Sequence, residues 1–367
     1  MQMEGPVGAR TVFDNQALDY FCGSGYLGLQ SHPGVLQMAE MAIKQYGVST
    51  ATSRGGFGEH PIYEQLEEEA CAFFDCEKVI YFASGYMGPS ILMQTVCYPQ
   101  DHIFIDSVAH YSLWDAAQIT NKTITPFRHN DPEHLRNCIR NELLADERPV
   151  ILTDGIFPIS GEIARLPEYL EIIEPYAGRL CVDDAHAAGV LGAHGRGSLE
   201  YFGIKDERCL ATATLAKALG GFGGIIGGKT NWINYVERKS TICAGASPPP
   251  LVVAAASSAG LEIARSAPAL RMNLWENVKQ ARNGFRQLGW DMEDTPSPII
   301  CLQDRVGDHL QHVQSGLLER GIAVEFVRSY TSTPAGGALR IAIFATHTKK
   351  QIDRLLENVE QLIKREE

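Results

Sequence analysis

Two short segments of the sequence place carboxylates and an amine directly after apolar runs. Asp183 and Asp184 follow one such run and precede His186. Two carboxylates are costly to bury there unless they meet a cation, a metal ion or a protonated heterocycle nitrogen. Lys217 follows a second run and precedes the glycine-rich segment 220–224, which is typical either of a lysine that forms a Schiff base or of a solvated lysine in a flexible loop. The glycines lack the spacing of a dinucleotide-binding loop.

Two further segments could bind anions. Ser84-Gly85-Tyr86 ends an apolar run before an expected helix, so its amide N–H groups could face a phosphate, although most Ser-Gly turns are only turns. Arg340 lies in an alternating apolar strand and needs an anionic partner, either a substrate carboxylate or a surface acid. All four segments lie at expected strands, and ligands of open α/β sheets gather at the carboxyl ends of strands.

Together the four segments supply a phosphate cradle, an acid, an amine and a carboxylate clamp. A pyridoxal phosphate enzyme requires this set, because a lysine holds the aldehyde of the cofactor as a Schiff base and an acid keeps the pyridine nitrogen protonated. The ring can then accept electrons from a substrate carbanion. The joint occurrence therefore favours pyridoxal 5'-phosphate as the cofactor, and we expect no metal site.

The elements that must position these residues alternate between short β-branched runs and longer stretches of helical period. The expected strands are 78–83, 102–106, 150–153, 179–183, 209–214 and 224–227. Helices are expected over Pro61–Phe74 and at the C-terminus, where one apolar stripe comprises Ile352, Leu355, Leu356, Val359, Leu362 and Ile363. This alternation predicts an α/β fold with a mostly parallel, doubly wound sheet.

A second, smaller α/β unit is expected toward the C-terminus. The prolines 248–250 stop regular structure before an Ala-rich helix. Beyond them, 289–301 and 321–344 are predicted to be β-rich, with helices before, between and after them. We therefore divide the chain into an N-terminal segment (1–48), a large cofactor-binding domain (49–265) and a small C-terminal domain (266–367).

Composition excludes several classes of protein. Hydrophobic residues are 45% and charged residues 21% of the 367 residues, which excludes disordered and fibrous chains. The net charge of −12 disfavours a nucleic-acid-binding face. No apolar run is long enough to span a membrane, and the first ten residues do not have the pattern of a signal peptide. The nine cysteines are odd in number and form no C-x-x-C, so we expect reduced thiols and a cytoplasmic location.

Several motifs make the sequence similar to one family over nearly its whole length, from about Leu18. They are Y-L-G-L at Tyr26–Leu29 with His32-Pro33, S-R-G-G-F-G at Ser53–Gly58, S-G-Y-M-G at Ser84–Gly88, H-N-D at His129–Asp131, V-D-D-A-H-A-A-G-V-L-G at Val182–Gly192, L-A-K-A-L-G-G at Leu215–Gly221 and L-R-I-A-I-F-A-T-H-T at Leu339–Thr348. The chain thereby resembles the α-oxoamine synthases, fold-type-I pyridoxal phosphate enzymes such as glycine C-acetyltransferase, 8-amino-7-oxononanoate synthase and serine palmitoyltransferase. The resemblance implies a class I/II aminotransferase fold.

The resemblance also implies roles for the catalytic residues. Lys217 would form the Schiff base with the cofactor and later move the α-proton of the substrate. Asp183, the first of the two aspartates, would pair with the pyridine nitrogen, and His186 would lie near the phenolic oxygen of the cofactor. His110 would stack on the pyridine ring.

Further residues are implied to bind the phosphate and the substrate. Ser84, Gly85, Tyr86 and Thr214 would hold the phosphate, Ser247 would reach the phosphate of a partner subunit, and Arg340 would clamp the amino acid carboxylate. Three positions depart from the family pattern. Ser24, expected to bind substrate, stands near where the family has Asn, Pro158 replaces a Ser, and Ala216 precedes the lysine in place of Ser or Gly.

These implications predict a homodimeric acyltransferase with a shared active site. It would condense glycine, alanine or serine with an acyl-CoA or acyl-carrier thioester, through a Schiff base and a quinonoid carbanion, to give an α-amino ketone. An aminotransferase needs the same lysine, aspartate and arginine and stays open as an alternative. A catalytically silent dimer that uses the fold as a binding scaffold is the third hypothesis.

Overall fold

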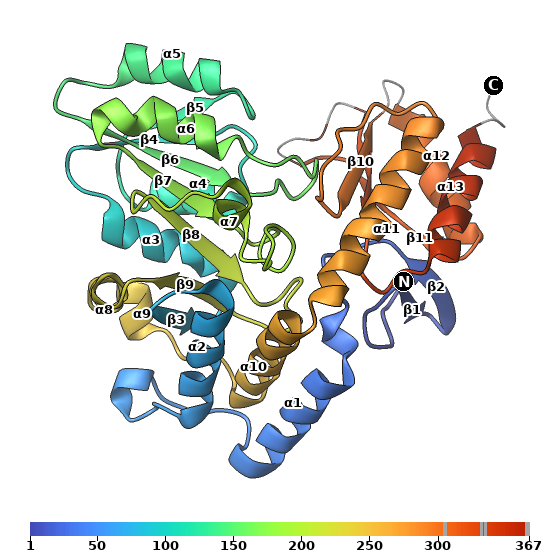
Figure 1. The fold of residues 1–367 in the computed structure, drawn as a ribbon, viewed down its shortest axis with the longest axis horizontal. Helices are drawn as coiled ribbons and strands as arrows, with labels where there is room; N and C mark the ends of the chain where they lie inside the picture. The colour runs from blue at the N-terminus through green and yellow to red at the C-terminus, as the bar shows by residue number, and fades with distance from the viewer. Residues whose placement is uncertain (304–306, 331–332, 334–335, 364–367) are drawn as a thin grey trace.

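The computed structural model describes residues 1–303, 307–330, 333 and 336–363. Figure 1 shows a large α/β unit on the left and a smaller C-terminal unit on the right, joined along α10 and α11. The helices between the two units are α10 (Leu251–Ser266) and α11 (Pro268–Gln287), and Ala267 separates them. Ala267 lies next to the boundary expected between the large and small domains, which stays a prediction.

The large unit is built on one seven-stranded sheet. In spatial order its strands are β3 (Lys78–Phe82), β9 (Gly224–Gly228), β8 (Cys209–Thr214), β7 (Arg179–Asp183), β6 (Arg148–Asp154), β4 (Asp101–Asp106) and β5 (Ile124–Phe127). β9 is antiparallel to both of its neighbours, and the remaining pairs are parallel. The predicted mostly parallel sheet is confirmed, and β5 is a strand that the sequence reading did not include.

Helices cover both faces of this sheet, because successive apolar side chains of each strand point to opposite sides. One face packs against α3 (Gly88–Val96), α4 (Tyr111–Gln118), α8 (Thr230–Lys239) and α9 (Thr241–Gly245). The other face packs against α2 (Pro61–Phe74), α5 (Pro132–Glu142), α6 (Leu166–Ile173), α7 (Ser198–Phe202) and α10. The doubly wound arrangement is therefore as predicted. Short 3₁₀ turns complete the unit at Leu29–Ser31, Arg54–Gly56, Gly85–Met87 and Glu174–Tyr176.

The C-terminal unit contains a second, antiparallel sheet. Its order is β10 (Ile299–Gln303), β13 (Ala338–Ala342) and β12 (Glu325–Val327), and its helices are α11, α12 (Gly307–Glu319) and α13 (Lys349–Ile363). The prediction that 289–301 is β-rich was wrong for most of that range, since β10 begins at Ile299 and residues 290–298 form no strand. Parts of the predicted β-rich range 321–344 lie outside the described residues.

The N-terminal segment is divided between the two units. β1 (Arg10–Phe13) pairs with β2 (Gln16–Tyr20), and β2 pairs in parallel with β11 (Ile322–Ala323) of the C-terminal unit. α1 (Pro33–Tyr46) then packs along α10 at the lower edge of Figure 1. In the described part of the chain, no helix has both the length and the hydropathy needed to cross a bilayer.

Candidate active site

A cavity of about 200 Å³ lies at the carboxyl ends of β6, β7 and β8. It is lined by Ser84, Gly85, Tyr86, His110, Ser112, Asp154, Asp183, Ala185, His186, Thr214, Ala216, Lys217, Phe222 and Gly223. Every cofactor-binding residue expected from the sequence except Ser247 is in this set. A larger hollow of about 1000 Å³ contains none of the expected site residues, so chemistry and not size identifies the site.

The two adjacent aspartates after β7 point into different environments. Asp183 lines the cavity, where its Oδ1 accepts the Ala185 amide N–H at 3.0 Å and its Oδ2 accepts the Ser112 hydroxyl at 3.3 Å. Asp184 does not line this cavity, and its Oδ2 accepts the Ser198 amide N–H at 2.9 Å. Burial raises the pKa of Asp184 to about 7. Of these two aspartates, Asp183 is therefore the one available to a ligand in the cavity.

A third buried carboxylate, Asp154, was missed by the sequence analysis. It is the last residue of β6, directly opposite Asp183 in the register of β6 and β7, and it accepts the His110 amide N–H at 2.9 Å. Burial, with the nearby charge of Asp183, raises the pKa of Asp154 well above its usual range. The signal was present in the sequence, because this acid follows the apolar run 150–153 directly.

Lys217 projects into the cavity from the turn after β8. Burial lowers its pKa to about 8, against the opposing effect of Asp183 and Asp154. Its Nζ lies 2.7 Å from Nε2 of His186, whose Nδ1 lies 2.7 Å from the Tyr26 hydroxyl. A lysine with a lowered pKa carries more neutral amine near neutral pH, and the neutral amine is the nucleophile toward an aldehyde.

Ser84, Gly85 and Thr214 form a tight cup at one end of the cavity. Ser84 precedes the 3₁₀ turn Gly85–Met87, and its Oγ accepts the Tyr86 amide N–H at 3.3 Å. The Thr214 hydroxyl donates to the Gly223 carbonyl at 2.9 Å. A Cβ atom on Gly85 would lie only 2.6 Å from Cβ of Thr214. Only glycine therefore allows the two segments to approach this closely.

His110 is the N-cap of α4 and lines the cavity beside Tyr86, with its ring centroid 5.8 Å from that of the tyrosine. Its Nδ1 lies 2.7 Å from the Ser112 hydroxyl. Burial lowers the pKa of His110. A neutral imidazole ring at the cavity wall is suited to stacking on a planar ligand.

Arg340 is buried on β13, outside the cavity lining but connected to it. Its Nε donates to the Pro158 carbonyl at 2.7 Å and its Nη1 to the Gly23 carbonyl at 3.0 Å. Its Nη1 also forms an ion pair with Oε2 of the surface residue Glu325 at 3.4 Å, and its Nη2 lies 3.5 Å from the Tyr26 hydroxyl. The backbone of Pro158, the residue that departs from the family pattern, therefore helps to orient the guanidinium.

The two remaining expected residues lie outside the cavity. Ser24 follows Gly23, whose carbonyl contacts Arg340, so it is next to the arginine without lining the cavity. Ser247 is exposed on the segment before α10. Within one chain, the structure does not bring Ser247 to the other site residues.

The chain is similar to known proteins over nearly its whole length. The Aminotransferase class I and II family matches residues 21–359. An 8-amino-7-oxononanoate synthase of Methylococcus capsulatus is 33% identical over 99% of this chain and 94% of that protein. A serine palmitoyltransferase of Bacteriovorax stolpii is 31% identical over 91% of this chain and 80% of that protein. The chain belongs to the α-oxoamine synthases.

The solved structure of Sphingomonas wittichii serine palmitoyltransferase has a TM-score of 0.90 and 25% identity, covering 97% of this chain and 90% of that one. Like other α-oxoamine synthases, this chain is a pyridoxal 5'-phosphate enzyme with a fold-type-I transferase fold. The donor set of the cavity fits this cofactor. Lys217 supplies an amine for the aldehyde, Asp183 supplies a carboxylate for the pyridinium, and the glycine-lined cup of Ser84, Gly85 and Thr214 suits the phosphate.

Substituting Gly85 by alanine tests whether the cup of this α-oxoamine synthase binds the phosphate. The added methyl group must displace Thr214, and overpacking of this kind costs about 1–3 kcal/mol. We expect the dissociation constant for pyridoxal phosphate to rise about tenfold or more. The measurement is an absorbance titration of apoprotein. Gly8→Ala is the control, since its Cβ would lie at an ordinary 3.7 Å from Oγ of Ser31; equal affinity in both variants would contradict the assignment.

Proposed function

We propose that this enzyme is a C-acyltransferase that condenses glycine, alanine or serine with an acyl-CoA or acyl-carrier thioester to give an α-amino ketone. The observation that carries the proposal is the hydrogen-bonded path from Lys217 through His186 and Tyr26 to Arg340. It joins an amine of lowered pKa to a buried guanidinium whose Nη2 makes one contact, at 3.5 Å, among the described residues. An α-amino acid presents an acidic Cα–H and a carboxylate to those two groups.

Each residue of the site has a role in this proposal. Pyridoxal phosphate, when bound, supplies an aldehyde for amines and an electron-accepting ring. Lys217 would hold the cofactor and later take the α-proton of the substrate on Nζ. Asp183 would keep the proton on the pyridine nitrogen, His110 would pack on the ring, His186 would face the phenolic oxygen, and the cup would hold the phosphate. Arg340 would orient the substrate carboxylate, as a guanidinium does with two hydrogen bonds.

The proposed reaction balances in bonds and protons. The Cα–H proton passes to Lys217, Cα forms a bond with the acyl carbon, and the C–S bond of the thioester breaks. The thiol leaves with a proton. The carboxylate is either retained or lost as CO₂, and in the second case Cα takes up a proton in its place. The names of the two curated relatives, an 8-amino-7-oxononanoate synthase and a serine palmitoyltransferase, support an acyl thioester as the second substrate.

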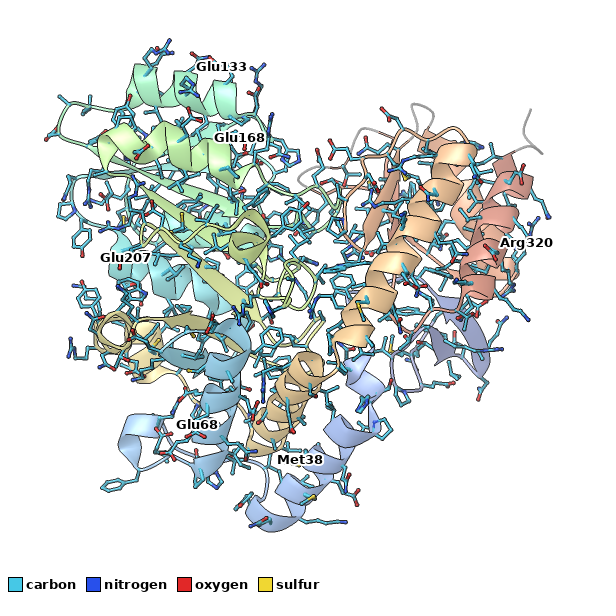
Figure 2. All side chains as sticks on the ribbon, in the orientation of Figure 1. Met38, Glu68, Glu133, Glu168, Glu207 and Arg320 are labelled. Atoms are coloured by element: carbon cyan, nitrogen blue, oxygen red, sulfur yellow. The ribbon has the colours of Figure 1, made fainter. Side chains whose placement is uncertain are left out.

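We also propose that the enzyme is a homodimer with a shared site. α1 exposes Leu36, Met41, Ile43 and Tyr46 to 41–52%, and the apolar surface continues to the exposed Val48. Figure 2 shows the side chains of this helix, with Met38 labelled, at the edge of the molecule. The Leu251 amide donates to the Val48 carbonyl, which places the segment that carries Ser247 beside this surface. A partner covering α1 would thus meet Ser247.

A cytoplasmic location, expected from the nine cysteines, stays a prediction.

Release of thiol tests the proposed reaction. Purified protein is incubated with glycine, alanine or serine and with a panel of acyl-CoA thioesters of different chain length, and the free thiol is measured. We expect release that requires both substrates, which identifies the pair at once. If no pair gives thiol and a keto acid instead restores the cofactor after reaction with an amino acid, the enzyme is an aminotransferase and the proposal is wrong.

A further inference from the structure

A buried tyrosine that does not line the cavity, Tyr26, connects His186 with Arg340. The Tyr26 hydroxyl lies 2.7 Å from Nδ1 of His186, and Nε2 of the same ring lies 2.7 Å from Nζ of Lys217. Arg340 approaches the hydroxyl from the other side, with Nη2 at 3.5 Å. Tyr26 is fully buried and His186 is 6% exposed, so the bond between them is shielded from bulk water.

The donors and acceptors of this path have one arrangement that satisfies all of them. A guanidinium only donates, so the Tyr26 oxygen accepts from Arg340. The hydroxyl proton of Tyr26 then needs an acceptor, because a buried O–H without one is costly. Among the described residues, Nδ1 of His186 is the acceptor within hydrogen-bonding distance of this hydroxyl. The single proton of a neutral imidazole is thereby left on Nε2, the nitrogen that faces Lys217.

The charge states of the path agree with this arrangement. Burial raises the pKa of Tyr26 to about 12, so the hydroxyl keeps its proton. Burial, then the charges of Lys217 and Arg340, lowers the pKa of His186 well below its usual value, so the ring is neutral. An Nε2–H group can donate to the lone pair of a neutral Lys217 amine, whereas it opposes an ammonium.

We propose that Tyr26 is a positioning residue: it sets the proton of His186 on Nε2 and so favours the neutral amine of Lys217 whenever that amine is free. The remaining charged groups that act on Lys217 are Asp183, Asp154 and Arg340. The two carboxylates favour the ammonium, and Tyr26, through His186, acts against them. The inference rests on the proposed role of Lys217 in holding the cofactor and not on the identity of the amino acid or acyl donor.

The effect of Tyr26→Phe on the charge of Lys217 follows from the loss of one proton donor. Phenylalanine keeps the ring and removes only the oxygen. The His186 proton is then free to move to Nδ1, and Nε2 becomes an acceptor for the Lys217 ammonium. The ammonium gains a hydrogen bond, so the pKa of Lys217 rises from about 8 by about one unit.

The rate at which full-length apoprotein captures pyridoxal phosphate, followed by absorbance between pH 6 and 10, reports the fraction of neutral Lys217. We expect the wild-type rate to be half-maximal near pH 8. The Tyr26→Phe profile should be displaced upward by about one pH unit, with about tenfold slower capture at pH 7 and an unchanged plateau at high pH. Tyr169→Phe is the matched control, because Tyr169 is also fully buried and donates to Asn130 outside the cavity.

Profiles that coincide, or a Tyr26→Phe rate reduced equally at every pH, would overturn the proposal for Tyr26 alone. Capture by a Lys217→Ala protein at the wild-type rate would instead overturn the role of Lys217. Should Tyr26→Phe fail to fold, the imidazole ¹⁵N shifts of histidine-labelled wild-type apoprotein decide the point, with His186 assigned by its absence in His186→Gln. A proton on Nε2 supports the proposal, and a proton on Nδ1 overturns it.

Discussion

Replacing Lys217 with alanine is expected to lower amino-acid-dependent thiol release by at least about 10³-fold. The reason is geometric, because Lys217 supplies the amine in a cavity that also holds Asp183 and His186. Reduction with borohydride should attach the cofactor to the peptide containing Lys217 in the wild-type protein and leave it unattached in the variant. Peptide mass measurement therefore reads out the assignment independently of turnover.

Lys229→Ala is the control for this experiment. Lys229 lies on the same chain segment as the glycine-rich turn but is 62% exposed and paired with Glu207 at the surface. Its removal should leave turnover and cofactor attachment within twofold of wild type. Full turnover of Lys217→Ala would show that another group moves the α-proton and would contradict the catalytic assignment of Lys217.

Replacing Asp183 with asparagine is expected to lower kcat by about 10²- to 10⁴-fold. A neutral amide cannot hold the proton of the pyridine nitrogen by charge, although it has the size of the carboxylate and can still accept from the Ala185 amide and the Ser112 hydroxyl. We also expect weaker cofactor binding, measured by the same absorbance titration as for Gly85→Ala.

Asp184→Asn provides the matched control, one residue away. Asp184 bonds to the Ser198 amide and does not line the cavity. Because burial raises its pKa to about 7, its ionisation opposes folding as the pH rises from its ordinary range through 7. The neutral amide removes this penalty, so Asp184→Asn should keep its activity and have a melting temperature at pH 8 that is equal to or above wild type. Similar losses of activity in the two variants would contradict the assignment of Asp183.

Elements with a clear apolar pattern could be predicted to within a residue. β7, β8 and α2 have the expected bounds, because each combines an uninterrupted apolar pattern with a definite end. β5 (Ile124–Phe127) was missed since it has four residues and contains Pro126. Proline is tolerated there because β5 is an edge strand, and being at the edge is a property of the assembled sheet that a local pattern does not contain.

In the candidate site too, some features could be predicted from local sequence and others depend on tertiary packing. The Asp183, His186 and Lys217 segments each follow a strand, so sequence alone could place them at one edge of the sheet. Tyr26 was read only as part of a motif, because its partner His186 is 160 residues away along the chain. That pairing depends on how β2, α1 and the large sheet pack together, which no periodicity of the sequence encodes.

The position of β9 in the large sheet determines how long β3 lacks a partner strand while the protein is being synthesised. β3 is hydrogen-bonded to β9 alone in that sheet, and Phe82 pairs with Gly224. A ribosome adding about 5–20 residues per second needs on the order of 10 s between these two residues. During that interval β3 leaves the ribosome as an apolar strand with no partner in the sheet. The interval between the synthesis of Asp19 and that of its partner Ile322 is longer still. The edge of β3 that pairs with β9 therefore stays open until residues 224–228 have been synthesised.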